Sequence, residues 1–200
     1  KLTALVGLNA SGKSNVVKAL TFLSKSREQN SITDISRLDL GMQSVQQLFH
    51  RLENNLKLGL RTKGDNEDLS YEISITPKGS VASERVMTKT RDLLVRDGAG
   101  ETRYLTDSQK EDHYSVPSLE RSVFSFLPDN SHYLTKRVRE FIGDIRTYSS
   151  DADQIRSIAS SGFSSRLDRR GSNLAQVLHT LLTFDRRKFL AIEETMKDLI

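Results

Sequence analysis

The sequence predicts an α/β fold in which a phosphate-binding turn joins a strand to a helix and is followed by an antiparallel β-meander and a helical subdomain. Three observations lead to this prediction. Residues 7–14 read GLNASGKS, which fits the pattern GxxxxGK[ST]. Residues 56–61 and 69–75, on either side of a polar turn, alternate between apolar and polar side chains. From Pro117 onward, the apolar residues recur at helical spacing.

The composition is that of a globular chain. The 200 residues are 36% hydrophobic, which suffices for one sizeable core. The sequence contains no cysteine and no run of roughly 18 apolar residues. We therefore expect a cytoplasmic protein without membrane contact. The net charge of +4 permits a nucleic-acid partner without requiring one.

The context of the glycine-rich segment fits a phosphate-binding loop. Residues 2–6 are almost continuously apolar, as expected of a strand in a parallel sheet. A helix is expected from near Lys13, with Val16, Val17, Leu20 and Leu23 on one side. Strand, turn and helix follow in the required order. Since the chain opens directly in the apolar run, we expect the start of the natural protein to be missing here.

The residue types of the loop suit a nucleoside triphosphate. Gly7 and Gly12 allow the backbone to turn several N–H groups inward, and the positive end of the following helix adds to this anion site. Lys13 can reach the β and γ phosphates, and the Ser14 hydroxyl can coordinate Mg²⁺. We therefore predict Lys13 as the catalytic lysine and Ser14 as a metal ligand.

The middle of the chain predicts a meander of about four strands. The alternation in residues 56–60 and 69–75 predicts a hairpin with Leu58, Tyr71 and Ile73 facing a core. Further strands are expected around residues 84–95 and 101–105, with turns at residues 63–68, at residues 77–80 and at Asp97-Gly98. Before the meander, we expect a polar loop or frayed helix end over residues 24–36 and a short helix within residues 39–52.

The last part of the chain predicts helices. Residues 119–127 and 134–145 carry apolar stripes at helical spacing, and residues 149–172 form a polar connection. A helix is expected from Leu174 after a cap at Ser172 or Asn173, and a last one carries Phe189, Ile192, Met196 and Leu199. We accordingly divide the chain into an ATPase-head part, residues 1–106, and a helical subdomain, residues 107–200.

The loop resembles a Walker A motif of one particular kind. With Asn9 at its third position and Asn15 directly after Ser14, it is similar to that of ABC-type ATPases of the SMC, RecF and OLD kind. The meander and the segment Gly171-Ser172-Asn173-Leu174 resemble stand-alone AAA family ATPases, many of which belong to bacterial anti-phage systems such as Septu. The resemblance implies a P-loop NTPase fold of ABC-ATPase type that binds ATP and Mg²⁺ through Gly7, Asn9, Ala10, Ser11, Gly12, Lys13, Ser14 and Asn15.

The same resemblance implies parts that this sequence does not show. Such ATPases also carry a signature motif, a Walker B Asp-Glu pair and a switch histidine. Residues 93–97 and 141–144 come nearest to a Walker B motif, but they fit a hairpin strand and a helix better. We therefore expect the N-terminal portion of a larger ATPase, an incomplete fold that is inactive alone. Gln109 is the preferred Q-loop glutamine and Mg²⁺ ligand, with Gln43, Gln46 and Gln47 as weaker candidates.

The resemblance implies an ATP-driven switch. Two heads would form a homodimer around two ATP molecules and act on DNA, or control a partner nuclease, in defence or repair. Two alternatives remain open. A GTPase or small-molecule kinase is one, since residues 168–171 fit the pattern DxxG. A non-enzymatic nucleic-acid-binding or scaffold module is the other, because basic residues cluster at 136–137, 169–170 and 186–188.

Overall fold

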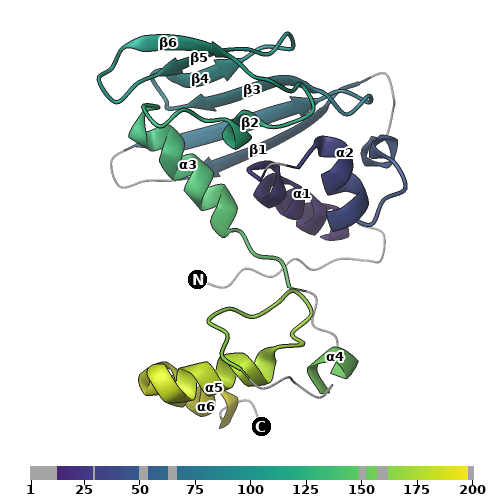
Figure 1. Ribbon diagram of the computed structural model, residues 1–200, viewed down its shortest axis with the longest axis vertical. Helices are drawn as coiled ribbons and strands as arrows, with labels where there is room; N and C mark the ends of the chain where they lie inside the picture. The colour runs from purple at the N-terminus through teal and green to yellow at the C-terminus, as the bar shows by residue number, and fades with distance from the viewer. Residues whose placement is uncertain are drawn as a thin grey trace. The chain divides into compact units, whose positions relative to one another are not determined.

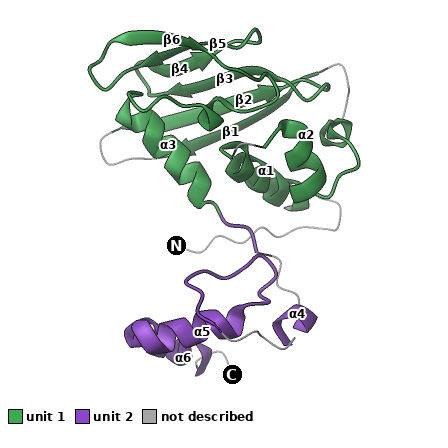
Figure 2. Cartoon of the chain, viewed as in Figure 1, with its two compact units in different colours: residues 1–145 green, residues 146–200 purple. Residues whose placement is uncertain are grey.

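The computed structural model describes residues 13–28, 30–49, 54–62, 67–148, 152–156 and 162–197. Figure 1 shows their helices and strands, and Figure 2 shows the two compact units, residues 1–145 and 146–200. The strand predicted at residues 2–6, the loop residues 7–12 and most of the turn predicted at residues 63–68 lie outside the described residues.

A six-stranded antiparallel sheet forms the centre of the first unit, and its strands are neighbours in space in the order of the sequence. Leu58 pairs with Ile73, and Leu60 pairs with Tyr71. Tyr71 and Ile73 are buried and Leu58 packs half-buried against the same core, which confirms the predicted sheet. The strands are β1 (Leu56–Thr62), β2 (Leu69–Ile75), β3 (Val81–Met87), β4 (Asp92–Arg96), β5 (Glu101–Leu105) and β6 (Glu111–Ser115).

The prediction of about four strands is wrong at two places. Residues 84–95 form parts of two strands, because the chain turns at residues 88–91, where the Thr88 hydroxyl accepts hydrogen bonds from the N–H groups of Thr90 and Arg91. β6 was not predicted, since only Tyr114 in it is shielded from solvent and no apolar alternation marks the strand. The turns at residues 77–80 and at Asp97-Gly98 are confirmed.

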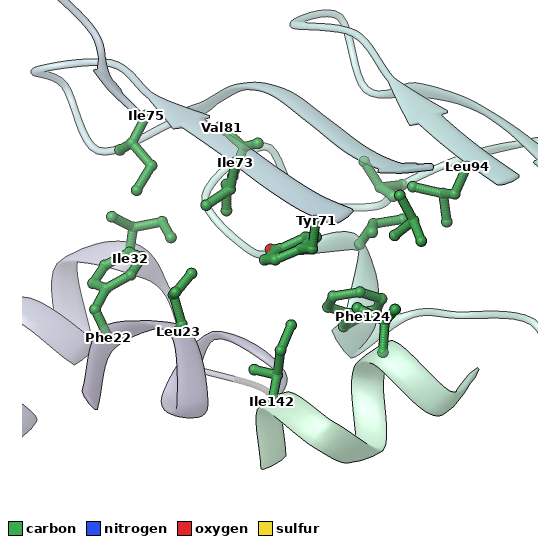
Figure 3. Packing of buried hydrophobic residues seen from close by; sticks show 14 of the residues in the cluster. Phe22, Leu23, Ile32, Tyr71, Ile73, Ile75, Val81, Leu94, Phe124 and Ile142 are labelled. Carbon is green, nitrogen blue, oxygen red and sulfur yellow. The ribbon is translucent and has the colours of Figure 1, made fainter. Parts of the chain in front are cut away.

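Helices α1 (Lys13–Ser26), α2 (Ile32–Asp34) and α3 (Tyr133–Asp144) lie on one face of this sheet (Figure 1). Their apolar side chains meet those of the strands in one core. Figure 3 shows this packing, with Phe22, Leu23, Ile32 and Ile142 from the helices and Tyr71, Ile73 and Ile75 from β2. A π-helix at Ile35–Asp39 and 3₁₀ helices at Val45–Leu48 and Val123–Ser125 complete the unit.

Three helical predictions need correction. The expected loop or frayed helix end over residues 24–36 is wrong at both ends, because α1 continues to Ser26 and the helical turns from Ile32 onward bury Ile32 and Ile35 in the core. On α1 the predicted apolar side is correct only near its C-terminal end, since Leu23 is buried whereas Val16 and Val17 are exposed. Residues 119–127 contain a 3₁₀ helix of one turn instead of an amphipathic helix.

The predicted helix over residues 134–145 is confirmed as α3. Leu134, Val138 and Ile142 are buried, and Phe141 is exposed. Because α3 packs on the sheet, the compact units divide between Ile145 and Arg146. The division expected at residue 106 concerns the lobes of an ATPase and stays a prediction.

The second unit contains α4 (Ala152–Arg156), α5 (Leu174–Phe184) and α6 (Arg186–Lys197). The predicted start of α5 is confirmed, with Asn173 as the residue before the helix. The predicted apolar positions of α6 include Ile192 and Met196, both exposed, and Leu199, which is not among the described residues. None of the helices in the described ranges is long and apolar enough to cross a membrane.

A buried carboxylate connects β3 to the chain that follows the sheet. Glu84 accepts hydrogen bonds from the hydroxyls of Tyr71 (2.8 Å) and Ser122 (2.5 Å) and from the Val123 N–H (2.8 Å). Burial raises the pKa of Glu84, and these three donors together with the charge of Arg96 oppose that shift. The carboxylate thereby holds residues 122–123 against the sheet.

Arg96 is the buried counter-ion. It pairs in register with Glu84, its Nη1 lies 3.7 Å from Glu84 Oε2, and both side chains are fully buried. Its guanidinium also donates to the carbonyl oxygens of Arg121 (2.5 Å) and Ser118 (3.2 Å). Burial lowers the pKa of Arg96, whereas the neighbouring carboxylate raises it. The pair therefore fixes both the register of β3 with β4 and the path of residues 118–123.

Breaking this pair from one side should be costly. Arg96→Met would leave the Glu84 carboxylate buried without its counter-ion, so we expect the free energy of unfolding to fall by about 3–5 kcal/mol. Urea denaturation measures this change. Lys89→Met is the matched control, because Lys89 forms an exposed pair with Asp68 (3.0 Å) and its loss should cost about 1 kcal/mol or less.

The double variant Glu84→Gln/Arg96→Met removes both charges, so it should be more stable than Arg96→Met alone. If Arg96→Met lowers the free energy of unfolding no more than Lys89→Met does, the buried pair does not fix the register of β3 with β4 as we describe.

Candidate nucleotide-binding site

The described part of the predicted site is the first turn of α1. Lys13 opens the helix, and Ser14 and Asn15 follow it with exposed side chains. The turn contains no acidic residue, so no side-chain charge within it offsets the positive end of the helix dipole. The other predicted ligands, Gly7, Asn9, Ala10, Ser11 and Gly12, and the side chain of Lys13 lie outside the described part of the chain.

The far end of α1 anchors this turn. Residues 14–18 are exposed, whereas Phe22 and Leu23 are buried in the core. The Ser24 hydroxyl donates to the Ile145 carbonyl oxygen at 3.0 Å, which ties the helix to the end of α3. The helix therefore presents an exposed N-terminal end from a well-packed base.

A cavity of about 240 Å³ lies beside α1. Asn15, Lys18 and Phe22 line it from the helix, and Leu56 and Leu58 line it from β1. Gln47, one of the weaker Q-loop candidates, also lines this cavity, and its Oε1 accepts a hydrogen bond from the Gln43 N–H at 3.0 Å. The helix that follows the predicted loop therefore forms one wall of this cavity.

Gln109, the preferred Q-loop candidate, lies in the turn between β5 and β6 and has a left-handed backbone with φ of 64°. Its Oε1 accepts from Arg91 Nη1 at 2.5 Å, and its Nε2 lies 3.0 Å from His132 Nε2. These contacts are those of a residue that stabilises a turn. Its role as a Mg²⁺ ligand stays a prediction, and none of its hydrogen bonds to described residues reaches α1.

The structure places the Walker B candidates in other roles. Asp97 Oδ1 accepts from the N–H groups of Ala99 (3.0 Å) and Glu101 (3.1 Å) in the turn after β4, and Asp144 ends α3. A third run, which sequence reasoning missed, is apolar over residues 189–192 and ends in Glu193-Glu194, but it is helical in α6. Across the described ranges, no three His, Asp or Glu side chains gather to hold a metal ion.

The DxxG pattern at residues 168–171 is a turn closed by its own aspartate. The Asp168 carboxylate accepts from the N–H groups of Arg170 (3.0 Å), Gly171 (2.5 Å) and Ser172 (2.9 Å) and from the Ser172 hydroxyl. The Ser172 hydroxyl, followed by these N–H groups, lowers the pKa of Asp168. The carboxylate is used within its loop, so the pattern gives no support to a GTPase.

The Gly-Ser-Asn segment, whose role the sequence left open, is structural. Asn173 accepts from the Asp168 N–H at 2.8 Å and donates to Ser164 Oγ (3.0 Å) and to the Arg166 carbonyl oxygen (2.9 Å). Gly171 has φ of 82°, and a Cβ there would lie 2.9 Å from a side-chain carbon of Ile155. The segment therefore closes the loop before α5.

Two of the three basic clusters contain a lysine that is already paired. Lys136 lies 3.0 Å from Asp107, and Lys188 lies 2.6 Å from Asp185. These pairs reduce the positive charge that the clusters could offer to a phosphate backbone.

Comparison with known proteins adds the family. A family model described as "AAA domain, putative AbiEii toxin, Type IV TA system" matches residues 2–193. No curated protein and no solved structure matches the chain. The matched range includes the glycine-rich loop and all of α1, so the family covers both the predicted site and the fold that supports it. The chain belongs to this AAA-domain family of P-loop ATPases.

Proposed function

We propose that this chain binds ATP with Mg²⁺ and works as an ABC-type, SMC/RecF-like ATPase. The observation that carries the proposal is the acid-free first turn of α1, which begins within the sequence GLNASGKS and exposes Ser14 and Asn15. A helix N-terminus preceded by a glycine-rich turn is an anion site, because its N–H groups point at the ligand and the dipole favours negative charge. Membership of a P-loop ATPase family supports ATP as that anion.

The chemistry follows from the residue types. The backbone of residues 7–12 would cradle the phosphates, and the Lys13 ammonium would neutralise the β and γ phosphates. The Ser14 hydroxyl would occupy one position on Mg²⁺, and phosphate oxygens and water would fill the others. The metal supplies charge neutralisation on the transferred phosphoryl group. Asn15, exposed on the same turn, completes the proposed set.

We further propose that ATP acts by joining two copies of the protein. A ligand shifts an equilibrium only through its different affinity for the two states, and an ATP molecule held between two heads contributes contacts only in the dimer. Hydrolysis would then separate the heads. In our proposal, such a switch acts on DNA or restrains a partner nuclease, in defence or repair.

The runner-up functions have less support. The GTPase or kinase alternative was based on the DxxG pattern at residues 168–171. The Asp168 carboxylate accepts hydrogen bonds within its own loop, so this pattern does not support that alternative. A non-enzymatic nucleic-acid or scaffold module would bind nucleotide without any turnover in any assembly. Guanine-against-adenine competition separates the first alternative from our proposal, and phosphate release by the native full-length protein separates the second.

Lys13→Ala should remove most ATP binding, because charge-assisted hydrogen bonds to the phosphates contribute about 1.5–3 kcal/mol, or roughly tenfold to a hundredfold in affinity. Calorimetry measures the affinity. Lys78→Ala is the matched control, since Lys78 is an exposed lysine of the turn between β2 and β3 and its loss changes the net charge equally. Equal affinities in wild type and Lys13→Ala would contradict the site.

Ser14→Ala should remove the gain in ATP affinity that Mg²⁺ provides, because the alanine has no oxygen for the metal. Affinity without Mg²⁺ should change little. Ser14→Thr keeps the hydroxyl, so it should retain the gain. Titrations with and without Mg²⁺ test this, and a Ser14→Ala variant with an undiminished Mg²⁺ effect would show that another group holds the metal.

The 200-residue chain should bind ATP yet hydrolyse it negligibly. Phosphate binding is ground-state recognition and lowers no barrier by itself, and hydrolysis needs a group that orients water. Asp97 and Asp168 are engaged in their own turns and Glu193 lies within α6. Phosphate release at several protein concentrations measures turnover. A rate of about 1 s⁻¹ or more that is independent of protein concentration would refute the proposal that hydrolysis needs a second head.

A further inference from the structure

β1 is an edge strand. Among the described residues it pairs with β2 on one side and with no strand on the other. In an antiparallel pair, alternate residues direct their N–H and C=O groups away from the partner strand. Such an edge is a template on which an extended polypeptide can add by main-chain hydrogen bonding.

The two edges of the sheet differ in chemistry. In β6 four of the five residues are exposed, and Glu111, Asp112 and His113 crowd this edge with polar groups. Charged residues of this kind are a common protection against strand addition. β1 instead carries three half-buried leucines, Leu56, Leu58 and Leu60, on its core-facing side. β1 also carries exposed charges, Lys57 and Arg61, but only on its outer face, so its core-facing side lacks the polar groups that protect β6.

The cavity of about 240 Å³ lies on the core side of this edge. Leu56 and Leu58 form one wall, and Ala19 and Phe22 of α1 form another. Side chains of an added strand would lie directly opposite those of β1, alternately on the two faces of the sheet. The residues of that strand that lie opposite Leu56 and Leu58 would therefore face the cavity, where an apolar side chain could be buried.

The outer face of the same strand is positive. Lys57 and Arg61 are exposed, and their register partners on β2 are the neutral residues Ser74 and Ser70. Neither cation forms an ion pair with a described residue. Glu72 lies between them in the register, opposite Gly59, and leaves this part of the face with a net positive charge. Acidic residues on an added strand would find complementary charge here.

We propose that the edge of β1 that no described strand covers docks an extended polypeptide strand in which apolar residues alternate with acidic ones. The apolar side chains enter the cavity beside α1, and the acidic side chains lie opposite Lys57 and Arg61. One residue of the cavity lining, Asn15, also belongs to the first turn of α1, whereas Lys57 and Arg61 belong to β1 alone.

The probe is a synthetic seven-residue peptide in which valine alternates with glutamate. With the isotope-labelled 200-residue chain, we expect saturable binding and slower hydrogen exchange at alternate amides of β1. A peptide of the same composition with its valines and glutamates in two blocks cannot place one type on each face, so it should bind at least tenfold more weakly. Absence of binding, or protection confined to β6, would overturn the proposal.

A charge exchange tests the recognition. Lys57→Glu/Arg61→Glu should weaken binding of the valine–glutamate peptide about tenfold and should strengthen binding of a valine–lysine peptide. Lys78→Glu/Lys110→Glu is the control, because both lysines are exposed in turns and the net charge changes equally. Equal losses in the two variants would overturn the proposal. The proposal would also be overturned if the chain dimerised without peptide and its β1 amides were protected from hydrogen exchange. The strand docked at β1 would then be a second copy of the chain.

Discussion

The buried pair of Glu84 and Arg96 is the interaction on which the rest of the first unit depends. Two opposite charges without contact with water are tolerable only if most of the donors and acceptors around them are satisfied, and of the Arg96 nitrogens only Nε is buried without a partner among the described residues. Tyr71 from β2 and the segment from Ser118 to Val123 provide those partners. A shift of β3 against β4, or another path for this segment, would leave a charge buried alone. The pair therefore selects one arrangement of the sheet and of the chain that crosses it.

That arrangement determines where the nucleotide site lies. The segment tied to Glu84 continues into Phe124, whose ring packs on Tyr71 with centroids 5.0 Å apart, and then leads to α3. α3 and β2 in turn form the surface on which Phe22 and Leu23 of α1 are buried. Because only this end of α1 is packed, its first turn stays open to a ligand. Catalytic groups held on such a rigid base need less ordering when the ligand arrives.

The sequence was informative where the chemistry is local or periodic. The strands β1 and β2 were predictable because one buried face produces an alternation over residues 56–61 and 69–75. The phosphate-binding loop could be proposed from sequence because its residues are consecutive, and its residues 7–12 lie outside the described residues. β6 was not predicted because an exposed edge strand needs no apolar alternation. Ile32 and Ile35 were missed because their neighbours in the sequence are polar. The burial of Glu84 and Arg96 depends on partners 13 to 39 residues away, which no local pattern reveals.

The difference between a local sequence pattern and the contacts that the structure shows also decides which polar motifs can perform chemistry. Asp97 and Asp168 stand in patterns that suggest a Walker B motif and a GTPase, yet each carboxylate accepts several hydrogen bonds from its own turn. An oxygen used in this way would have to give up those bonds to hold a metal or a water. Within the described part of the chain, the side chains of Ser14 and Asn15 make no such bonds, and they lie at the positive end of a helix. The family match over residues 2–193 and the acid-free N-terminal turn of α1 together favour this turn as the candidate site.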